Sequence, residues 1–179
     1  MKSDVIQIDS LGNGYREAVE ETRRVAEYKK LSRSDSLHLQ LFTEETLSML
    51  HSVTGEIKAS FWLEAEDSEF KLFVSTKTVM DKEKRYLLIS SSTSRKNAAA
   101  NSFLGRLRDA FEEALTAEAD HTYFELPDFI PQSDLPSGSF DQDEWDCYER
   151  SILLKLADNV EIAIKGGRVT MTITKKFEA

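Results

Sequence analysis

Two alternating runs near the end of the chain constrain the fold more than any other feature. Residues 160–164 and 169–174 alternate apolar with polar side chains, and Lys165-Gly166-Gly167-Arg168 separates them. Because successive side chains of a strand point to opposite faces, this alternation predicts strands with one buried and one wet face. A glycine pair between two such runs favours a tight hairpin turn.

A second hairpin and a first short strand extend the predicted sheet. Residues 57–66 and 69–76 alternate in the same way around Asp67-Ser68, which predicts another tight turn. Residues 5–9 form a β-branched run that stops at the turn-forming cluster Gly12-Asn13-Gly14. Strands therefore gather towards the two ends of the chain, around a helical middle.

Apolar residues at helical spacing predict the helices. They occur in residues 15–31, 37–53, 97–116 and 141–157, with a shorter candidate at 81–89. For the second of these helices, Ser34-Asp35-Ser36 offers N-cap residues and Gly55 a C-terminal cap. Three prolines within residues 118–143 predict a long loop.

Length and composition favour one folded domain. The chain has 179 residues, of which 40% are hydrophobic and 31% are charged, and this is ordinary for a single globular domain covering residues 1–179. The elements predict an α/β fold of the α+β two-layer sandwich type. In this fold a mixed, mostly antiparallel sheet is covered on one face by helices.

Charge and residue usage exclude several kinds of partner and ligand. Lys and Arg total 23 against 32 Asp and Glu, a formal net charge of -9, so the chain lacks the concentrated basic surface that nucleic acid needs. No segment approaches the roughly 18 apolar residues of a membrane span, and the N-terminus has no signal-peptide pattern, which favours a cytoplasmic protein. A single cysteine, Cys147, and three scattered histidines predict no metal site.

The element order and two local segments resemble the ATP-binding domain shared by histidine kinases, gyrase and the MutL proteins. Residues 42–51, FTEETLSMLH, resemble the family's helix that carries a Glu and, four residues later, an Asn that helps to hold magnesium. Residues 152–162 resemble the family's last helix, which runs into the final hairpin. The compact anti-sigma-factor serine kinases are the most similar branch. The resemblance implies a histidine-kinase-like ATPase fold in which residues 77–143 are an enlarged lid-like insertion.

The same resemblance implies a nucleotide site with identifiable members. Glu44 would be the general base that activates a hydroxyl towards a γ-phosphate, which requires a buried carboxylate. Ser48 stands where the family has its magnesium-binding Asn. The family's Asp-x-Gly-x-Gly turn corresponds to residues 74–79, which contain neither Asp nor Gly, so Asp81 is the candidate replacement for the adenine contact. The alternative is that Glu44 is a solvated helix residue and Ser48 a small packed one.

Residues 90–97 are a second candidate site. Hydroxyl groups, Arg95 and Lys96 lead through Asn97 into a predicted helix, and the N–H groups at a helix start favour an anion such as phosphate. A solvated, capped loop is the favoured alternative, because no glycine permits a close phosphate cradle. Phosphorylation of the hydroxyls by a partner kinase is another hypothesis.

These observations lead to two hypotheses from different classes. The first is a bacterial regulatory protein with a degenerate ATP-binding domain, similar to anti-sigma factors, which binds ATP or ADP with Mg²⁺ weakly and acts through a protein partner. The second is a non-catalytic interaction module of the same fold that binds no nucleotide. An efficient kinase or ATPase is not expected; if the protein is active, its chemistry is that of an ATP-dependent serine kinase. A homodimer that pairs through sheets and first helices is expected by analogy with related regulators.

Overall fold

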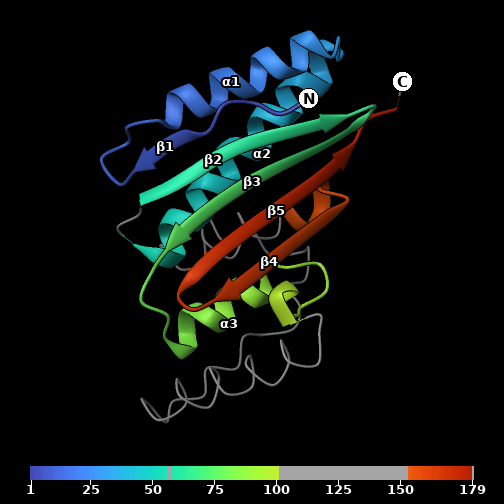
Figure 1. The fold of residues 1–179 in the computed structure, drawn as a ribbon. Coiled ribbons are helices and arrows are strands. Elements are labelled where there is room, and N and C mark those ends of the chain that lie inside the picture. Colours follow the sequence, from blue (N-terminus) through green and yellow to red (C-terminus); the bar gives the residue numbers. More distant parts are fainter. Residues whose placement is uncertain (56–57, 101–152, 179) are drawn as a thin grey trace, which may run out of the picture.

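One five-stranded antiparallel sheet organises the molecule (Figure 1). The computed structural model describes residues 1–55, 58–100 and 153–178. The strands are β1 (Ile6–Asp9), β2 (Lys58–Glu66), β3 (Glu69–Lys77), β4 (Asn159–Lys165) and β5 (Arg168–Lys176). Their order across the sheet is β1-β2-β3-β5-β4. Both predicted hairpins and the first strand are confirmed, and each pair of neighbouring strands is antiparallel, where a mixed sheet was expected.

The described helices leave one face of the sheet uncovered. They are α1 (Tyr15–Tyr28), α2 (Arg33–Thr54), α3 (Lys82–Ser90) and the 3-10 turn η1 (Ala98–Ala100), together with the helical residues 153–156. Figure 1 shows α2 passing behind β2 and β3, whose other face is turned towards the viewer. The predicted α+β layering, with helices on one face of the sheet, is therefore confirmed for the described residues.

Most of the predicted helical middle lies outside the described residues. The helix expected at residues 97–116 is described only at its start, where Ala98–Ala100 form a 3-10 turn. The expected loop at 118–143 lies outside the described residues. So does the helix expected from 141, apart from residues 153–156, which are helical.

The second helix begins earlier than the sequence predicts. Ser32 is its N-cap: the Ser32 hydroxyl accepts a hydrogen bond from the Asp35 backbone N–H at 3.1 Å and donates one to the Asp35 carboxylate at 2.7 Å. This reciprocal arrangement stabilises the first turn as a capping box does, so Ser34-Asp35-Ser36 lies inside the helix. Gly55 ends the helix as predicted, with a φ of 73°.

Side-chain alternation places the core between the sheet and the helices. Phe61 and Leu63 of β2 and Phe70 and Leu72 of β3 are completely buried, while the residues between them are half-buried or exposed on the opposite face. On the helical side α1 packs on α2. There the buried hydroxyls of Thr22 and Thr43 form a hydrogen bond of 2.9 Å.

The outer edge of β4 is covered by the segment of residues 91–97. The Thr93 backbone N–H donates to the Val160 carbonyl at 2.9 Å, and the Val160 N–H donates to the Thr93 hydroxyl at 2.8 Å. The Asn97 side chain bonds both the N–H and the carbonyl of Ile164, at 2.8 and 3.0 Å. A free edge would template pairing with another sheet, so this segment disfavours a homodimer built through the β4 edge. Homodimerisation by another surface stays a prediction.

Candidate functional site

Two of the predicted nucleotide residues lie on α2, and the third lies at the start of α3. Glu44 is exposed on α2 and Ser48 is half-buried one turn further on, so Glu44 does not have the burial that tuning of a general base requires. Asp81 is exposed and acts as the N-cap of α3, where its carboxylate accepts the Lys84 N–H at 2.7 Å. The cap explains Asp81 without a nucleotide.

The candidate phosphate segment has a structural role at one of its three named positions. Arg95 and Lys96 are exposed, and Arg95 has a positive φ of 51°. Asn97 is 5% exposed, and its amide bonds the backbone of β4. Because these two bonds use both the oxygen and the nitrogen of that amide, the Asn97 side chain is committed to the sheet edge and not to an anion.

The structure instead brings basic side chains together at one end of the uncovered sheet face. Lys77 of β3 lies directly opposite Arg168 of β5, and Arg168 lies opposite Lys165 of β4. Ala59 of β2 pairs with Thr76 of β3, so Lys58, one residue earlier, is level with Lys77. We call these four cations, Lys58, Lys77, Arg168 and Lys165, the basic row. Neighbouring strands are about 4.8 Å apart, so the row crosses four strands over roughly 14 Å.

Hydroxyl groups form a second row beside the cations. Ser60, Ser75 and Thr170 face each other on β2, β3 and β5, one pleat away from the basic row. The hydroxyls of Ser75 and Thr170 are 3.2 Å apart, and the Ser60 hydroxyl donates to the side-chain carbonyl of Gln7 at 3.2 Å. All three serine and threonine side chains are half-buried. Hydrogen-bond donors therefore line the surface directly beside the positive charges.

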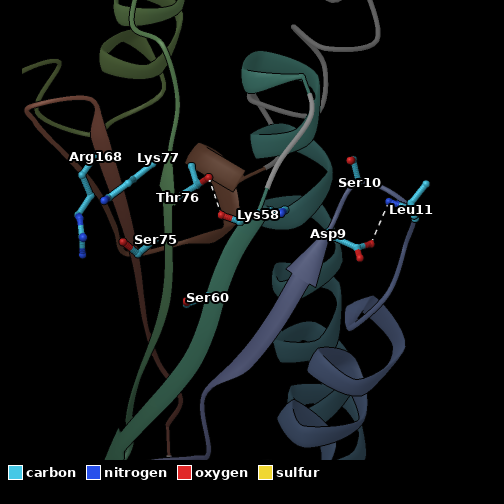
Figure 2. A pocket seen from close by; sticks show the side chains of 9 residues that line it. All are labelled: Asp9, Ser10, Leu11, Lys58, Ser60, Ser75, Thr76, Lys77 and Arg168. Atoms are coloured by element: carbon cyan, nitrogen blue, oxygen red, sulfur yellow. Dashed lines mark hydrogen bonds between the residues drawn. The ribbon is translucent and has the colours of Figure 1, made fainter.

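An open hollow of about 610 Å³ lies over three members of the basic row and over the Ser60 and Ser75 hydroxyls. Figure 2 shows the side chains that line it, with Lys77 and Arg168 next to each other on neighbouring strands. The lining residues are Asp9, Ser10, Leu11, Lys58, Ser60, Ser75, Thr76, Lys77 and Arg168. Neither Glu44, Ser48 nor Asp81 is among them, so the hollow is distinct from the nucleotide site that the resemblance implies.

A glycine turn joins the two hairpins next to the basic row. The Thr78 N–H, just after β3, donates to the Gly167 carbonyl at 2.9 Å. Gly167 has a φ of 73°, and a side chain on it would lie 3.1 Å from the Thr78 carbonyl. The absence of a Cβ therefore permits the close approach that sets Arg168 beside Lys77.

The carboxylate in the hollow, that of Asp9, contributes to the lining opposite Lys58 but forms no ion pair with it within 4.0 Å. Asp9 is paired with Lys58 across β1 and β2, but its carboxylate accepts hydrogen bonds from the Leu11 and Asn13 backbone N–H groups and from the Asn13 amide. The Asn13 side chain is the main reason that the pKa of Asp9 lies below its ordinary value. Figure 2 shows Asp9 turned towards its own loop.

At the opposite end of the same face the cations are paired with carboxylates. Lys71 and Lys176 both form ion pairs with Glu69, at 2.8 and 3.1 Å, and Lys2 pairs with Glu64 at 2.9 Å. The hydrogen bond from Lys71, with that from Lys176, lowers the pKa of Glu69. Among the described residues, by contrast, no member of the basic row forms an ion pair within 4.0 Å, which makes the two ends electrostatically unlike.

An aromatic pair lies between the two ends. The rings of Trp62 on β2 and Phe73 on β3 stack with centroids 5.0 Å apart and planes 3° from parallel. Both side chains are half-exposed. The Trp62 indole N–H donates to Glu64 at 3.3 Å, and the Lys2 ammonium lies 5.1 Å from the Trp62 ring centroid. These contacts hold the indole in place on the surface of the sheet.

The basic row is the feature that sequence reasoning missed. Each hairpin places two of its cations at the same end, Lys58 with Lys77 and Lys165 with Arg168, and these local registers follow from the hairpin turns. The pairing of β3 with β5 joins the two sets, and that contact is not local. Sequence reasoning treated Lys165 and Arg168 as turn residues only.

Comparison with known proteins does not identify a family. No protein-family model matches this sequence, and no curated protein matches it. Within the part of the chain that the structure describes, no cluster of three or more His, Cys, Asp or Glu side chains could hold a metal ion. In the same residues, no helix is long and apolar enough to cross a membrane.

Proposed function

We propose that this chain is a non-catalytic regulatory module that binds a protein partner through the uncovered face of its sheet. The observation that carries the proposal is the stacked pair of Trp62 and Phe73 in the middle of that face. Aromatic side chains are enriched at protein interfaces, where they dominate the binding energy. The pair stands half-exposed on a rigid strand pair, and none of the described helices covers it.

The residues around the aromatic pair indicate what kind of partner surface would fit there. Ser60 and Ser75 flank the rings on one side, and the ion pairs of Glu64 and Glu69 flank them on the other. An apolar centre with a polar rim is the usual anatomy of a protein interface. The fitting partner is therefore a protein that presents an apolar side chain to the rings and hydrogen-bonding groups to their surroundings.

The test compares partner binding by a Trp62→Thr/Phe73→Thr variant with that by the unaltered chain. Threonine retains the preference for strands, so the change removes the rings and keeps the sheet. Proteins captured from cells that express the chain are identified by mass spectrometry, purified and titrated by calorimetry. We expect the variant to bind the genuine partner at least ~30-fold more weakly, as for the loss of an interface hot spot.

A Tyr28→Gln variant is the matched control. Tyr28 is 72% exposed on α1, so its removal deletes an aromatic ring from a different surface. This control should bind the partner as the unaltered chain does. If every captured protein binds the Trp62→Thr/Phe73→Thr variant with unchanged affinity, the sheet face is not the docking surface and the proposal fails.

Nucleotide binding at Glu44 and Ser48 stays a prediction, and thermal unfolding with ATP and magnesium tests it. A ligand that binds only the folded state raises the unfolding midpoint. Because Glu44 is exposed, we expect any change that millimolar ATP with magnesium causes in the unfolding midpoint to be the same for the unaltered chain and for Glu44→Ala. A shift that Glu44→Ala or Ser48→Ala reduces would restore the first hypothesis and contradict a module without a nucleotide site.

A further inference from the structure

We propose that the basic row and the hydroxyl groups beside it form a binding site for a phosphate group. The inference rests on the open hollow over Lys58, Lys77 and Arg168 and on the Ser60 and Ser75 hydroxyls that line it. It does not depend on the proposed function, because the aromatic pair lies outside the hollow. The site is made of strand residues, so their backbone positions are set by the sheet.

The arrangement of the charges favours a bound anion. Lys77 and Arg168 are directly opposite each other, and like charges in this position destabilise a sheet. Lys165 continues the row on the next strand. The whole chain carries a net charge of -9, and yet no described carboxylate lies within ion-pair distance of these side chains. The row therefore retains an unfavourable repulsion that a bound anion would relieve.

The same sheet face shows that its cations are not left unpaired as a general rule. At the other end of β3 and β5, Lys71 and Lys176 share Glu69, so this face does pair its cations where no ligand is required. The carboxylate of Asp9, which is opposite Lys58 in the sheet, accepts its hydrogen bonds from Leu11 and Asn13. The positive end of the sheet is thus a local exception within one continuous face.

The donor set favours phosphate over a carboxylate. One guanidinium bonds both oxygens of a carboxylate, which leaves no further oxygen atom for the lysine and hydroxyl donors beside it, only the second lone pairs of the same two oxygens. A phosphate monoester has three oxygens that accept strong hydrogen bonds. Arg168 can bind two of them side by side, while Lys77 and the Ser75 hydroxyl reach the ligand from the neighbouring strand. Nucleic acid is disfavoured, because the remaining charge of the chain would repel a long polyanion.

Phosphate chemistry has two sources, a free small molecule and a phosphorylated side chain of a partner. The probes are inorganic phosphate, ATP without magnesium, and a short phosphoserine peptide with its unphosphorylated counterpart. Binding is followed at low ionic strength by the amide resonances of the isotope-labelled full chain. We expect phosphate to shift the amides of Ser75, Lys77 and Arg168 first. If ATP binds more tightly, the source is a free small molecule; if the phosphoserine peptide binds more tightly, the source is a phosphorylated partner.

Two double variants remove the same number of charges from the same two strands. Lys77→Gln/Arg168→Gln should weaken the binding of phosphate at least tenfold, whereas Lys71→Gln/Lys176→Gln should change it less than twofold. Trp62→Thr/Phe73→Thr should also leave phosphate binding unchanged, which separates this site from the proposed protein interface. Equal weakening by both charge variants would show unspecific attraction and overturn the proposal.

Thermal unfolding without ligand gives a second, independent readout. If Lys77 and Arg168 repel each other, Lys77→Gln/Arg168→Gln should unfold at or above the temperature of the unaltered chain, and the difference should shrink with added salt. The variant therefore remains folded for the binding experiment. A lower unfolding temperature would show that the two cations stabilise the sheet, and absence of binding at tens of millimolar phosphate would show that they hold no phosphate. Either result contradicts the proposed site.

Discussion

Replacing Gly14 with alanine is expected to destabilise the fold by about 4 kcal/mol, the upper range for a single substitution. Gly14 precedes α1 with a φ of 83°, a region in which a side chain costs roughly 1–2 kcal/mol. In addition, a Cβ at this position would lie 2.1 Å from the Gln7 backbone oxygen and 3.2 Å from the Ile8 Cα. Backbone atoms of a strand cannot rotate away, so β1 and α1 must separate.

Gly12→Ala is the matched control for Gly14→Ala. Gly12 has a φ of 87°, but a side chain there would have no atom within 4 Å. Its replacement should cost only the backbone strain, about 1 kcal/mol. Urea unfolding followed by circular dichroism measures both free energies. Equal losses for the two variants would mean that β1 and α1 can accommodate a Cβ at position 14 without a clash against Gln7.

Replacing Asn97 with alanine is expected to cost about 3 kcal/mol of unfolding free energy. The Asn97 amide bonds the N–H and the carbonyl of Ile164 and accepts the Ala99 N–H at 3.1 Å. Since Asn97 is 5% exposed, its loss leaves backbone groups of β4 without partners, at about 1–3 kcal/mol for each buried group. The measurement is again urea unfolding.

Ser94→Ala in the same segment is the control for Asn97→Ala. The Ser94 side chain is exposed, and its hydrogen bond with the Lys96 N–H, 3.3 Å long, is local. Such a surface substitution should change stability by about 0.5 kcal/mol or less. If Asn97→Ala costs no more than Ser94→Ala, water replaces the amide at the β4 edge and the segment is only a loose cover.

These two expectations concern the scaffold that presents the candidate site. Gly14 joins β1 to α1 at one side of the sheet, and Asn97 covers β4 at the other. Between them lie the three strands, β2, β3 and β5, that carry the aromatic pair and most of the basic row. A rigid face is a requirement for recognition because ordering flexible groups on binding reduces affinity.

Much of the local structure could be predicted because its causes are local. Gly166 and Gly167 have positive φ values of 58° and 73°, as the glycine pair between two alternating runs predicts for a tight hairpin. The position of the first helix turn of α2 was less predictable. Ser32 and Ser34 are both suitable N-cap residues. The helix begins after Ser32 because Asp35, three residues later, exchanges two hydrogen bonds with the Ser32 hydroxyl.

Glu44, Ser48 and Asp81 were predicted by resemblance, and Arg95, Lys96 and Asn97 from the pattern before an expected helix, but the surroundings of both sets depend on non-local packing. A glutamate at position 44 of an amphipathic helix can be buried or exposed according to which face of the helix meets the sheet. The neighbours Phe42 and Leu47 are buried, and this leaves Glu44 towards solvent. For Asn97 the deciding contact is with Ile164, which no local pattern relates to residue 97.

The sequence by itself determined which side chains of each strand share a face, because that alternation is a property of a single chain segment. It therefore determined that Lys58, Lys77, Lys165 and Arg168 stand at the ends of their hairpins. The tertiary structure alone decided that the two hairpins pair through β3 and β5, with Lys77 opposite Arg168. The register between strands that are distant in sequence is set by the joint burial of their apolar faces, and only the assembled core supplies that condition.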